Sequence, residues 1–239
     1  MRETGRLWWW VWSVASLILG PGAVSGGARS AEPLTIRTYD AAGLAAGEMQ
    51  SAWESGGHIL ERAGLAVIWL DCTAPRPSHA SPPPCSGTLA PRELVVRIVP
   101  AGAGIADHVL GSALVDRGRG VLATVYADRV RALADGAGTG IGQLIGRAVA
   151  HEVGHLLLGS ARHASRGLMR GVWEPGEVRN PRPWDWYLAD REAAGMRRGL
   201  VARARLADEV LAGLRGVPLS AGLDGHLDGG LELADVLRP

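Results

Sequence analysis

One segment, residues 151–163 with the sequence HEVGHLLLGSARH, constrains the fold of this chain more than any other. Its first two histidines, His151 and His155, are four residues apart. At that spacing two side chains share one face of an α-helix, where their imidazoles can bind one zinc ion. Glu152 follows the first histidine and can serve as general base for a water that the zinc activates. The alternative for this segment is a core helix with two buried histidines and a chance glutamate.

A third candidate ligand follows this helix. A catalytic zinc ion takes three protein ligands and keeps one position open. The third ligand has to reach the metal from the side opposite the helix, so the helix must end first. Gly159 favours a left-handed turn at a helix end, and His163 follows it by four residues. His163 is therefore the predicted third ligand, with a surface loop histidine as the alternative. A competing ligand scheme uses Glu192, on a later helix, in its place.

Apolar periodicity predicts an α/β domain over residues 33–200. The expected strands are residues 34–39, 66–70, 93–99, 112–115 and 120–126, and the expected helices are residues 48–62, 129–134, 141–158 and 187–214. The initial order of strand, helix and strand predicts a right-handed crossover in a mostly parallel sheet. Residues 120–126 lie between turn-prone segments, which favours an edge strand. Residues 201–239 are expected to complete the last helix and to form a flexible tail.

The N-terminus has the pattern of a secretory signal peptide over residues 1–25. Arg2 and Arg6 precede an apolar run at residues 7–20, and small residues follow it. This run is shorter than the roughly 20 residues that a membrane-spanning helix needs, so cleavage is favoured over a retained membrane anchor. We therefore expect an exported protein, secreted or periplasmic, with no stable membrane anchor.

The charge balance argues against nucleic acid as a partner. The sequence has 25 basic and 24 acidic residues. Residues 1–25 contain Arg2, Arg6 and Glu3, so the remainder has 23 of each sign. A chain without net charge lacks the basic surface that phosphate backbones require.

Cys72 and Cys85 are the only cysteines in the sequence. In an exported chain an even number of cysteines predicts a disulfide, which here would close the Pro-rich loop at residues 73–84. Two free thiols are one alternative. The other is a cysteine that caps the zinc of an inactive precursor, for which Cys85 has no supporting motif.

The HExxH helix, Gly159, His163 and the following Met169 together resemble a metzincin zinc metalloprotease of the matrixin or archaemetzincin type. The usual signature of that family is HExxHxxGxxH. This chain reads HExxHxxxGxxxH, so its glycine comes one residue late and its third histidine two residues late. The resemblance covers residues 33–190 in layout, but only residues 151–169 in motif. It implies a single zincin-like domain with a twisted, mostly parallel sheet and an antiparallel edge strand, packed on a crossover helix and an active-site helix. It also places Met169 as the floor beneath the zinc.

The same resemblance implies an activity, that of a zinc-dependent endopeptidase with Glu152 as general base. The implied zinc ligands are His151, His155 and His163. In metzincins an edge strand pairs with an extended protein or peptide substrate, and residues 121–126 would take that part here. Arg170 and Tyr187 are candidates to stabilise the oxyanion.

Two other functions fit the same residues. One is a non-catalytic, zinc-stabilised exported binding protein, against which Glu152 argues because a structural zinc needs no base. The other is a gluzincin-type peptidase that has Glu192 as its third ligand. The tryptophans at positions 173, 184 and 186 are expected to fill core rather than to line a specificity pocket. Substrate identity and oligomeric state do not follow from the sequence.

Overall fold

A computed structural model of the chain describes residues 32–73 and 85–215. The predicted signal peptide lies outside these residues, as do the middle of the Pro-rich loop and the predicted tail beyond Arg215.

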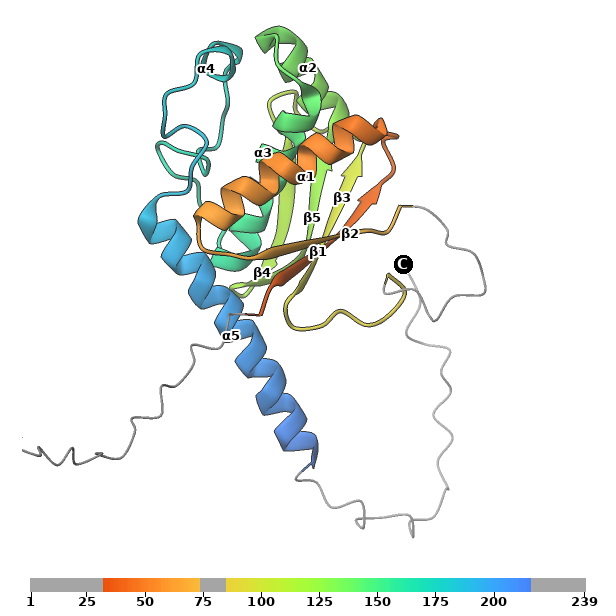
Figure 1. Cartoon of the computed structure of the whole chain (residues 1–239), viewed down its shortest axis with the longest axis vertical. Coiled ribbons are helices and arrows are strands. Elements are labelled where there is room, and N and C mark those ends of the chain that lie inside the picture. The colour runs from red at the N-terminus through yellow and green to blue at the C-terminus, as the bar shows by residue number, and fades with distance from the viewer. Residues whose placement is uncertain (1–31, 74–84, 216–239) are drawn as a thin grey trace, which may run out of the picture. The chain divides into compact units, whose positions relative to one another are not determined.

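The described residues contain one sheet of five strands in the order β2-β1-β3-β5-β4 (Figure 1). The strands are β1 (Leu34–Asp40), β2 (Val67–Asp71), β3 (Glu93–Val99), β4 (Gly111–Asp116) and β5 (Arg119–Tyr126). β1 pairs in parallel with β2 and β3, and β3 pairs in parallel with β5. β4 is antiparallel to β5. The expected α/β fold, a mostly parallel sheet with an antiparallel edge strand, is therefore confirmed.

The expectation that residues 120–126 form the edge of the sheet is wrong. β5 lies between β3 and β4, so β4 is the edge strand at this side. The reason is the turn between the two strands, in which Arg117 and Gly118 both have positive φ, 47° and 76°. Two consecutive residues in this conformation make a tight hairpin whose twist matches that of its strands, and the hairpin folds β4 back onto β5.

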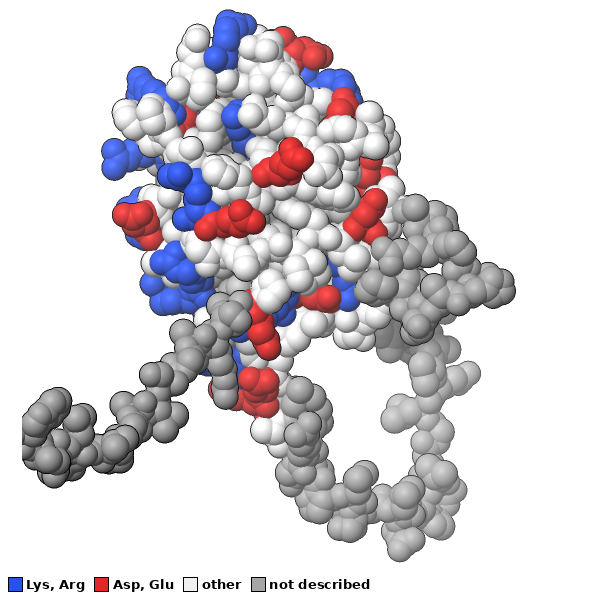
Figure 2. Space-filling model, viewed as in Figure 1, with Lys and Arg blue, Asp and Glu red and all other residues white. Residues whose placement is uncertain are grey.

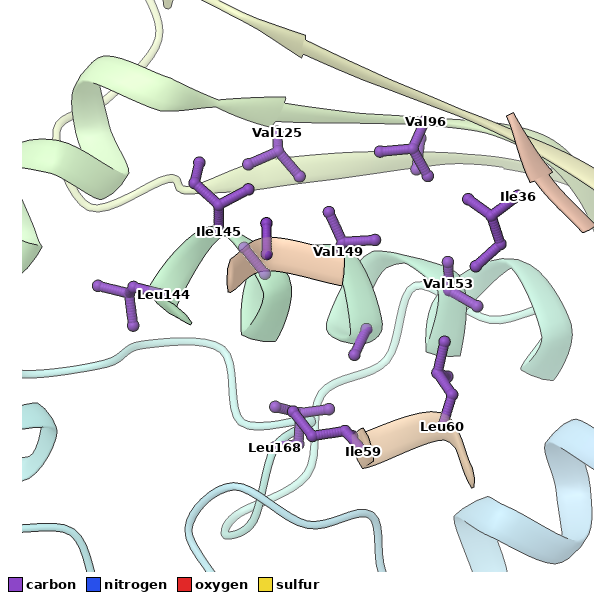
Figure 3. Close-up of a cluster of buried hydrophobic side chains, with 14 of the residues drawn as sticks. Ile36, Ile59, Leu60, Val96, Val125, Leu144, Ile145, Val149, Val153 and Leu168 are labelled. Atoms are coloured by element: carbon purple, nitrogen blue, oxygen red, sulfur yellow. The ribbon is translucent and has the colours of Figure 1, made fainter. Parts of the chain in front are cut away.

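The helices of the described residues are α1 (Ala46–Arg62), α2 (Ala127–Ala137), α3 (Ile141–Leu158), α4 (Pro175–Arg179) and α5 (Asp190–Arg215). α1 and α3 pack on one face of the sheet, where Ile36, Val96 and Val125 meet Val149 and Val153 (Figure 3). All five side chains are buried; the three strand residues point to this face because side chains alternate along a strand. None of these helices is long and apolar enough to cross a membrane.

Helix α3 is held close to α1 by two glycines. A Cβ atom at Gly142 would lie 2.3 Å from the backbone oxygen of Glu48, and one at Gly146 would lie 2.3 Å from that of Ala52. Larger residues at these positions would push the two backbones apart. Because α3 has its other face on the sheet, this close contact fixes the position of the helix that carries His151 and His155.

The opposite face of the sheet is partly covered by residues 85–92 of the loop that follows β2. Cys72 and Cys85 form the predicted disulfide at the base of this loop. Arg37, buried on β1, donates hydrogen bonds to the backbone oxygens of Gly87 and Thr88 and forms an ion pair with Glu93. The disulfide and these polar contacts hold the loop residues 85–92 on the sheet.

Figure 2 shows basic and acidic side chains distributed together over the surface in view.

Candidate metal centre

The structure brings His151, His155 and His163 together. Their candidate ligand atoms all lie within 4.8 Å of one another. The ring centroid of His163 lies 5.3 Å from that of His151 and 4.9 Å from that of His155. The two helical histidines are buried and His163 is exposed. The cluster therefore has a buried wall formed by α3 and an outer wall formed by the segment after it.

Two hydrogen bonds set the orientation of the helical imidazoles. Nδ1 of His151 donates to the backbone oxygen of Leu168 at 2.8 Å, and Nδ1 of His155 donates to that of Ser160 at 2.7 Å. A carbonyl oxygen only accepts hydrogen bonds, so each neutral imidazole carries its single N–H hydrogen on Nδ1. Each Nε2 atom therefore carries a lone pair. The Nε2 atoms are 3.0 Å apart. Two facing lone pairs repel unless a cation lies between them, so this donor set fits a metal ion.

Burial keeps these imidazoles in the neutral form that binds metals. Desolvation lowers the pKa of His151 to about 3, although the hydrogen bond to Leu168 acts in the opposite direction. Desolvation also lowers the pKa of His155. Because a protonated imidazole cannot be a ligand, both shifts favour metal binding at neutral pH.

The end of α3 directs the chain toward the third histidine. Gly159 has φ 62°, the left-handed conformation expected there, and the backbone N–H of Ser160 donates to the oxygen of His155. Gly159 also contacts the β4–β5 turn, since a Cβ atom on it would lie 2.2 Å from the backbone oxygen of Gly118. Both requirements exclude a larger residue. The chain then runs back to His163, whose ring completes the histidine cluster.

A turn at residues 167–170 packs against α3 and contacts His151 through the Leu168 carbonyl. Met169 is buried and packs on α3, where a Cβ atom at Gly154 would lie 2.6 Å from its sulfur. Its backbone oxygen accepts a hydrogen bond from the N–H of Ala164, which ties the turn to the segment that carries His163. The methionine singled out in the sequence thus lies directly under the helix that bears both histidines.

Glu152 lies between α3 and the edge strand β4. Its side chain is buried, and a Cβ atom at Gly111 would lie 2.7 Å from Oε1. Desolvation raises the pKa of this carboxyl to about 8. The structure therefore positions a carboxyl of increased proton affinity beside the histidine cluster.

Glu192 is not part of this cluster. Its Oε2 accepts a hydrogen bond from the backbone N–H of Ala189 at 2.8 Å, at the start of α5. This is a helix-capping contact. Among the described residues, the metal-ligating side chains that converge are those of His151, His155 and His163.

A cavity of about 350 Å³ adjoins the cluster. Three parts of the chain bound it: the segment that leads into β4, helix α3, and residues 163–173. Its lining residues are His108, Val109, Leu110, Gly111, Ala148, His151, Glu152, His163, Arg170, Gly171, Val172 and Trp173. No motif or spacing pointed to His108 before the fold was known. Of the three tryptophans expected in the core, Trp173 and Trp186 are buried, whereas Trp184 is 52% exposed. Trp173 is both buried and part of the cavity wall.

Comparison with known proteins shows similarity of structure but not of sequence. No protein-family model and no curated protein matches the chain. Archaemetzincin from Methanopyrus kandleri matches with a TM-score of 0.50 and 17% identity over 71% of this chain and 96% of that one. A zinc-dependent peptidase from Methanocorpusculum labreanum matches with a TM-score of 0.47 and 17% identity, over 67% and 99% of the two chains. The chain therefore has a fold similar to that of archaemetzincin.

Proposed function

We propose that this protein is a zinc-dependent endopeptidase in which Glu152 is the general base. The proposed zinc ligands are His151, His155 and His163. The observation that carries the proposal is the pair of Nε2 lone pairs 3.0 Å apart, fixed by backbone carbonyls and next to a buried carboxyl. The fold shared with archaemetzincin supports it. A purely structural zinc site is normally closed by four ligands, whereas within residues 32–73 and 85–215 three candidate ligands converge, and they border a cavity.

The chain's own residues perform the proton transfers and hold the reacting groups. A zinc ion held by the three histidines would act as a Lewis acid and would make a neighbouring water more acidic. The carboxylate of Glu152 would take a proton from the water as its oxygen bonds to the substrate carbonyl carbon, and would deliver that proton to the leaving amine as the peptide C–N bond breaks. His151 and His155 stay neutral and oriented through their Nδ1 hydrogen bonds.

We propose that the substrate binds as an extended strand along β4 rather than β5. One edge of β4 pairs with β5, and no strand among the described residues pairs with its other edge. Leu110 and Gly111, at the start of this strand, line the cavity that also contains Glu152. A peptide paired with the free backbone groups of β4 would thus pass in front of the general base.

The test is metal content together with hydrolysis of an unstructured protein. Purified protein dialysed against a weak chelator should retain about one zinc per chain, and it should cleave casein in a manner abolished by a strong chelator. Less than about a tenth of an equivalent of zinc would overturn the proposed site. Equimolar zinc without hydrolysis of any unstructured substrate would instead favour the exported binding protein.

We also propose that the protein works outside the cytoplasm. The disulfide between Cys72 and Cys85 supports this, because such bonds persist in oxidising compartments. Fractionation of cells that express the full chain, with N-terminal sequencing of the product, tests it. A cytoplasmic product that still begins at Met1 would contradict export.

A further inference from the structure

The wall of the cavity beside the histidine cluster contains buried hydrogen-bond donors that have no acceptors among the described residues. Arg170 lines this cavity and is 8% exposed. Its Nη1 donates to Oδ1 of Asp185 at 3.1 Å. Its Nη2 lies 3.5 Å from Oε2 of Glu177, an ion-pair distance without a hydrogen bond. Nε and Nη2 have no hydrogen-bond partner among the described residues.

The neighbouring tryptophan adds a further free donor. Trp173 also lines the cavity, and its ring packs edge-on against His151 with centroids 5.7 Å apart. Its buried Nε1–H has no partner in the described part of the chain, and the same holds for Trp186 behind it. Buried donors that lack partners cost free energy. A ligand that brings acceptors and no donors would therefore suit this wall, and a carboxylate is such a group.

The buried charges around this wall also favour an anion. Arg147 and Arg170 both pack on Trp186, with Cζ 4.1 Å and 5.3 Å from the ring centroid. Arg170 has a buried partner in Asp185, whereas Arg147 makes no ion pair with any residue in 32–73 or 85–215. Two buried cations thus share one buried anion. The remaining buried carboxyl in the cavity is that of Glu152, which the proposed function uses as base.

The rest of the lining is suited to an apolar stem. Leu110, Ala148 and Val172 present aliphatic groups to the cavity, whose volume of about 350 Å³ accommodates a complete side chain. Glutamate and aspartate combine a short methylene stem with a terminal carboxylate. We propose that this cavity is the subsite for an acidic side chain of the substrate and that Arg170 determines this specificity. The proposal rests on the proposed peptidase function.

The bound carboxylate would take the place of Glu177 as partner of Nη2. Glu177 is half exposed, and its ion pair with Arg170 is long, so little is lost when the guanidinium turns toward the cavity. The hydrogen bond from Nη1 to Asp185 would remain as the pivot of that movement.

Wild-type protein alone can test the preference. Cleavage sites in a mixed peptide library, identified by mass spectrometry, should show glutamate enriched at one position next to the scissile bond. Matched synthetic peptides with glutamate, glutamine, leucine or lysine at that position then give the size of the effect. We expect kcat/KM for the glutamate peptide to exceed that for the glutamine peptide at least tenfold, because a charge-assisted hydrogen bond replaces a neutral one. Equal values for the two peptides would overturn the proposal.

Three variants separate a role in specificity from a role in folding. Arg170→Gln should remove the glutamate preference, and Arg170→Lys should retain part of it. Asp185→Asn breaks the internal ion pair but keeps the cation, so the preference should persist. Arg166→Gln, at an exposed arginine of the same segment, is the matched control for net charge and should change nothing. If Asp185→Asn abolishes the preference and Arg170→Gln does not, Arg170 is not its source.

The proposal remains testable if hydrolysis itself is absent. Binding of the same glutamate and glutamine peptides to zinc-loaded Glu152→Gln protein, measured by calorimetry, does not require turnover. Tighter binding of the glutamate peptide would support the subsite even if the peptidase proposal failed. Equal binding, or a preference for lysine, would exclude it whether or not the protein is a peptidase.

Discussion

Gly159→Ala should destabilise the protein and weaken zinc binding. Two causes contribute, an unfavourable backbone conformation and a steric contact, and a control variant separates them. Gly159 has φ 62°, and an alanine in this left-handed conformation costs about 1–2 kcal/mol. Its Cβ atom would also lie 2.2 Å from the backbone oxygen of Gly118. That contact involves two backbones, so relieving it should cost about 1–3 kcal/mol more, as for other overpacked sites. The total is about 2–5 kcal/mol. The shift should also displace Ser160, whose carbonyl orients His155.

Gly138→Ala supplies the control because Gly138, with φ 67°, also ends a helix but has no atom within 4 Å of its added Cβ. This variant carries the conformational cost without the contact. Replacing glycine by alanine also makes the unfolded chain less flexible, which stabilises the folded protein. This contribution is the same in the two variants, so it cancels when their free energies of unfolding are compared. Urea unfolding of the metal-free proteins should therefore show Gly159→Ala to be less stable by about 1–3 kcal/mol than Gly138→Ala. Competition with a chromophoric chelator should show zinc affinity reduced about tenfold to a hundredfold in Gly159→Ala alone. Equal stability and equal affinity in the two variants would refute the reasoning.

Three other variants address the base, the third ligand and the disulfide. Glu152→Gln should lower casein hydrolysis on the order of a thousandfold while zinc stays equimolar, and turnover at the wild-type rate would contradict its role. His163→Ala should weaken zinc binding more than a hundredfold, whereas Glu192→Ala should only destabilise the start of α5. Loss of zinc in Glu192→Ala but not in His163→Ala would favour a gluzincin-type site with Glu192 as third ligand. Replacing Cys72 and Cys85 by serine opens a loop with a sequence separation of 13 and should cost about 3 kcal/mol in urea unfolding, and an unchanged midpoint would contradict this.

Most of the helices and strands could be predicted from the sequence, because the type of each element depends on its local apolar periodicity. The strand–helix–strand beginning and the long helix ending at Leu158 have clear apolar patterns, and both are present as expected. The order of strands depends on contacts between distant segments, which periodicity does not encode. The edge position was wrongly assigned to β5 because the hairpin turn at Arg117 and Gly118 has a weaker signal than Asn-Gly or Asp-Gly. A non-glycine residue with φ 47° is found there only from the structure.

The part of the candidate site that depends on local spacing could also be predicted from the sequence. His151 and His155 come together through helical spacing, which is a local property. The cavity wall is assembled from the segment around His108 and from Arg170 and Trp173, which are far apart in sequence. No spacing rule connects these residues. Their free donors are likewise a property of the folded environment, so the subsite could not be inferred before the structure.

The departure from the usual metzincin spacing has a structural explanation. One extra helical residue rotates the exit of a helix by about 100°, which alone would turn the following chain away from the metal site. Here the additional residue between Gly159 and His163 compensates, and the ring of His163 returns to 4.9 Å from that of His155. The Ser160 carbonyl, which directly follows Gly159, accepts a hydrogen bond from Nδ1 of His155. Convergence of the three imidazoles, rather than fixed spacing, is therefore the criterion by which a candidate site of this kind should be recognised.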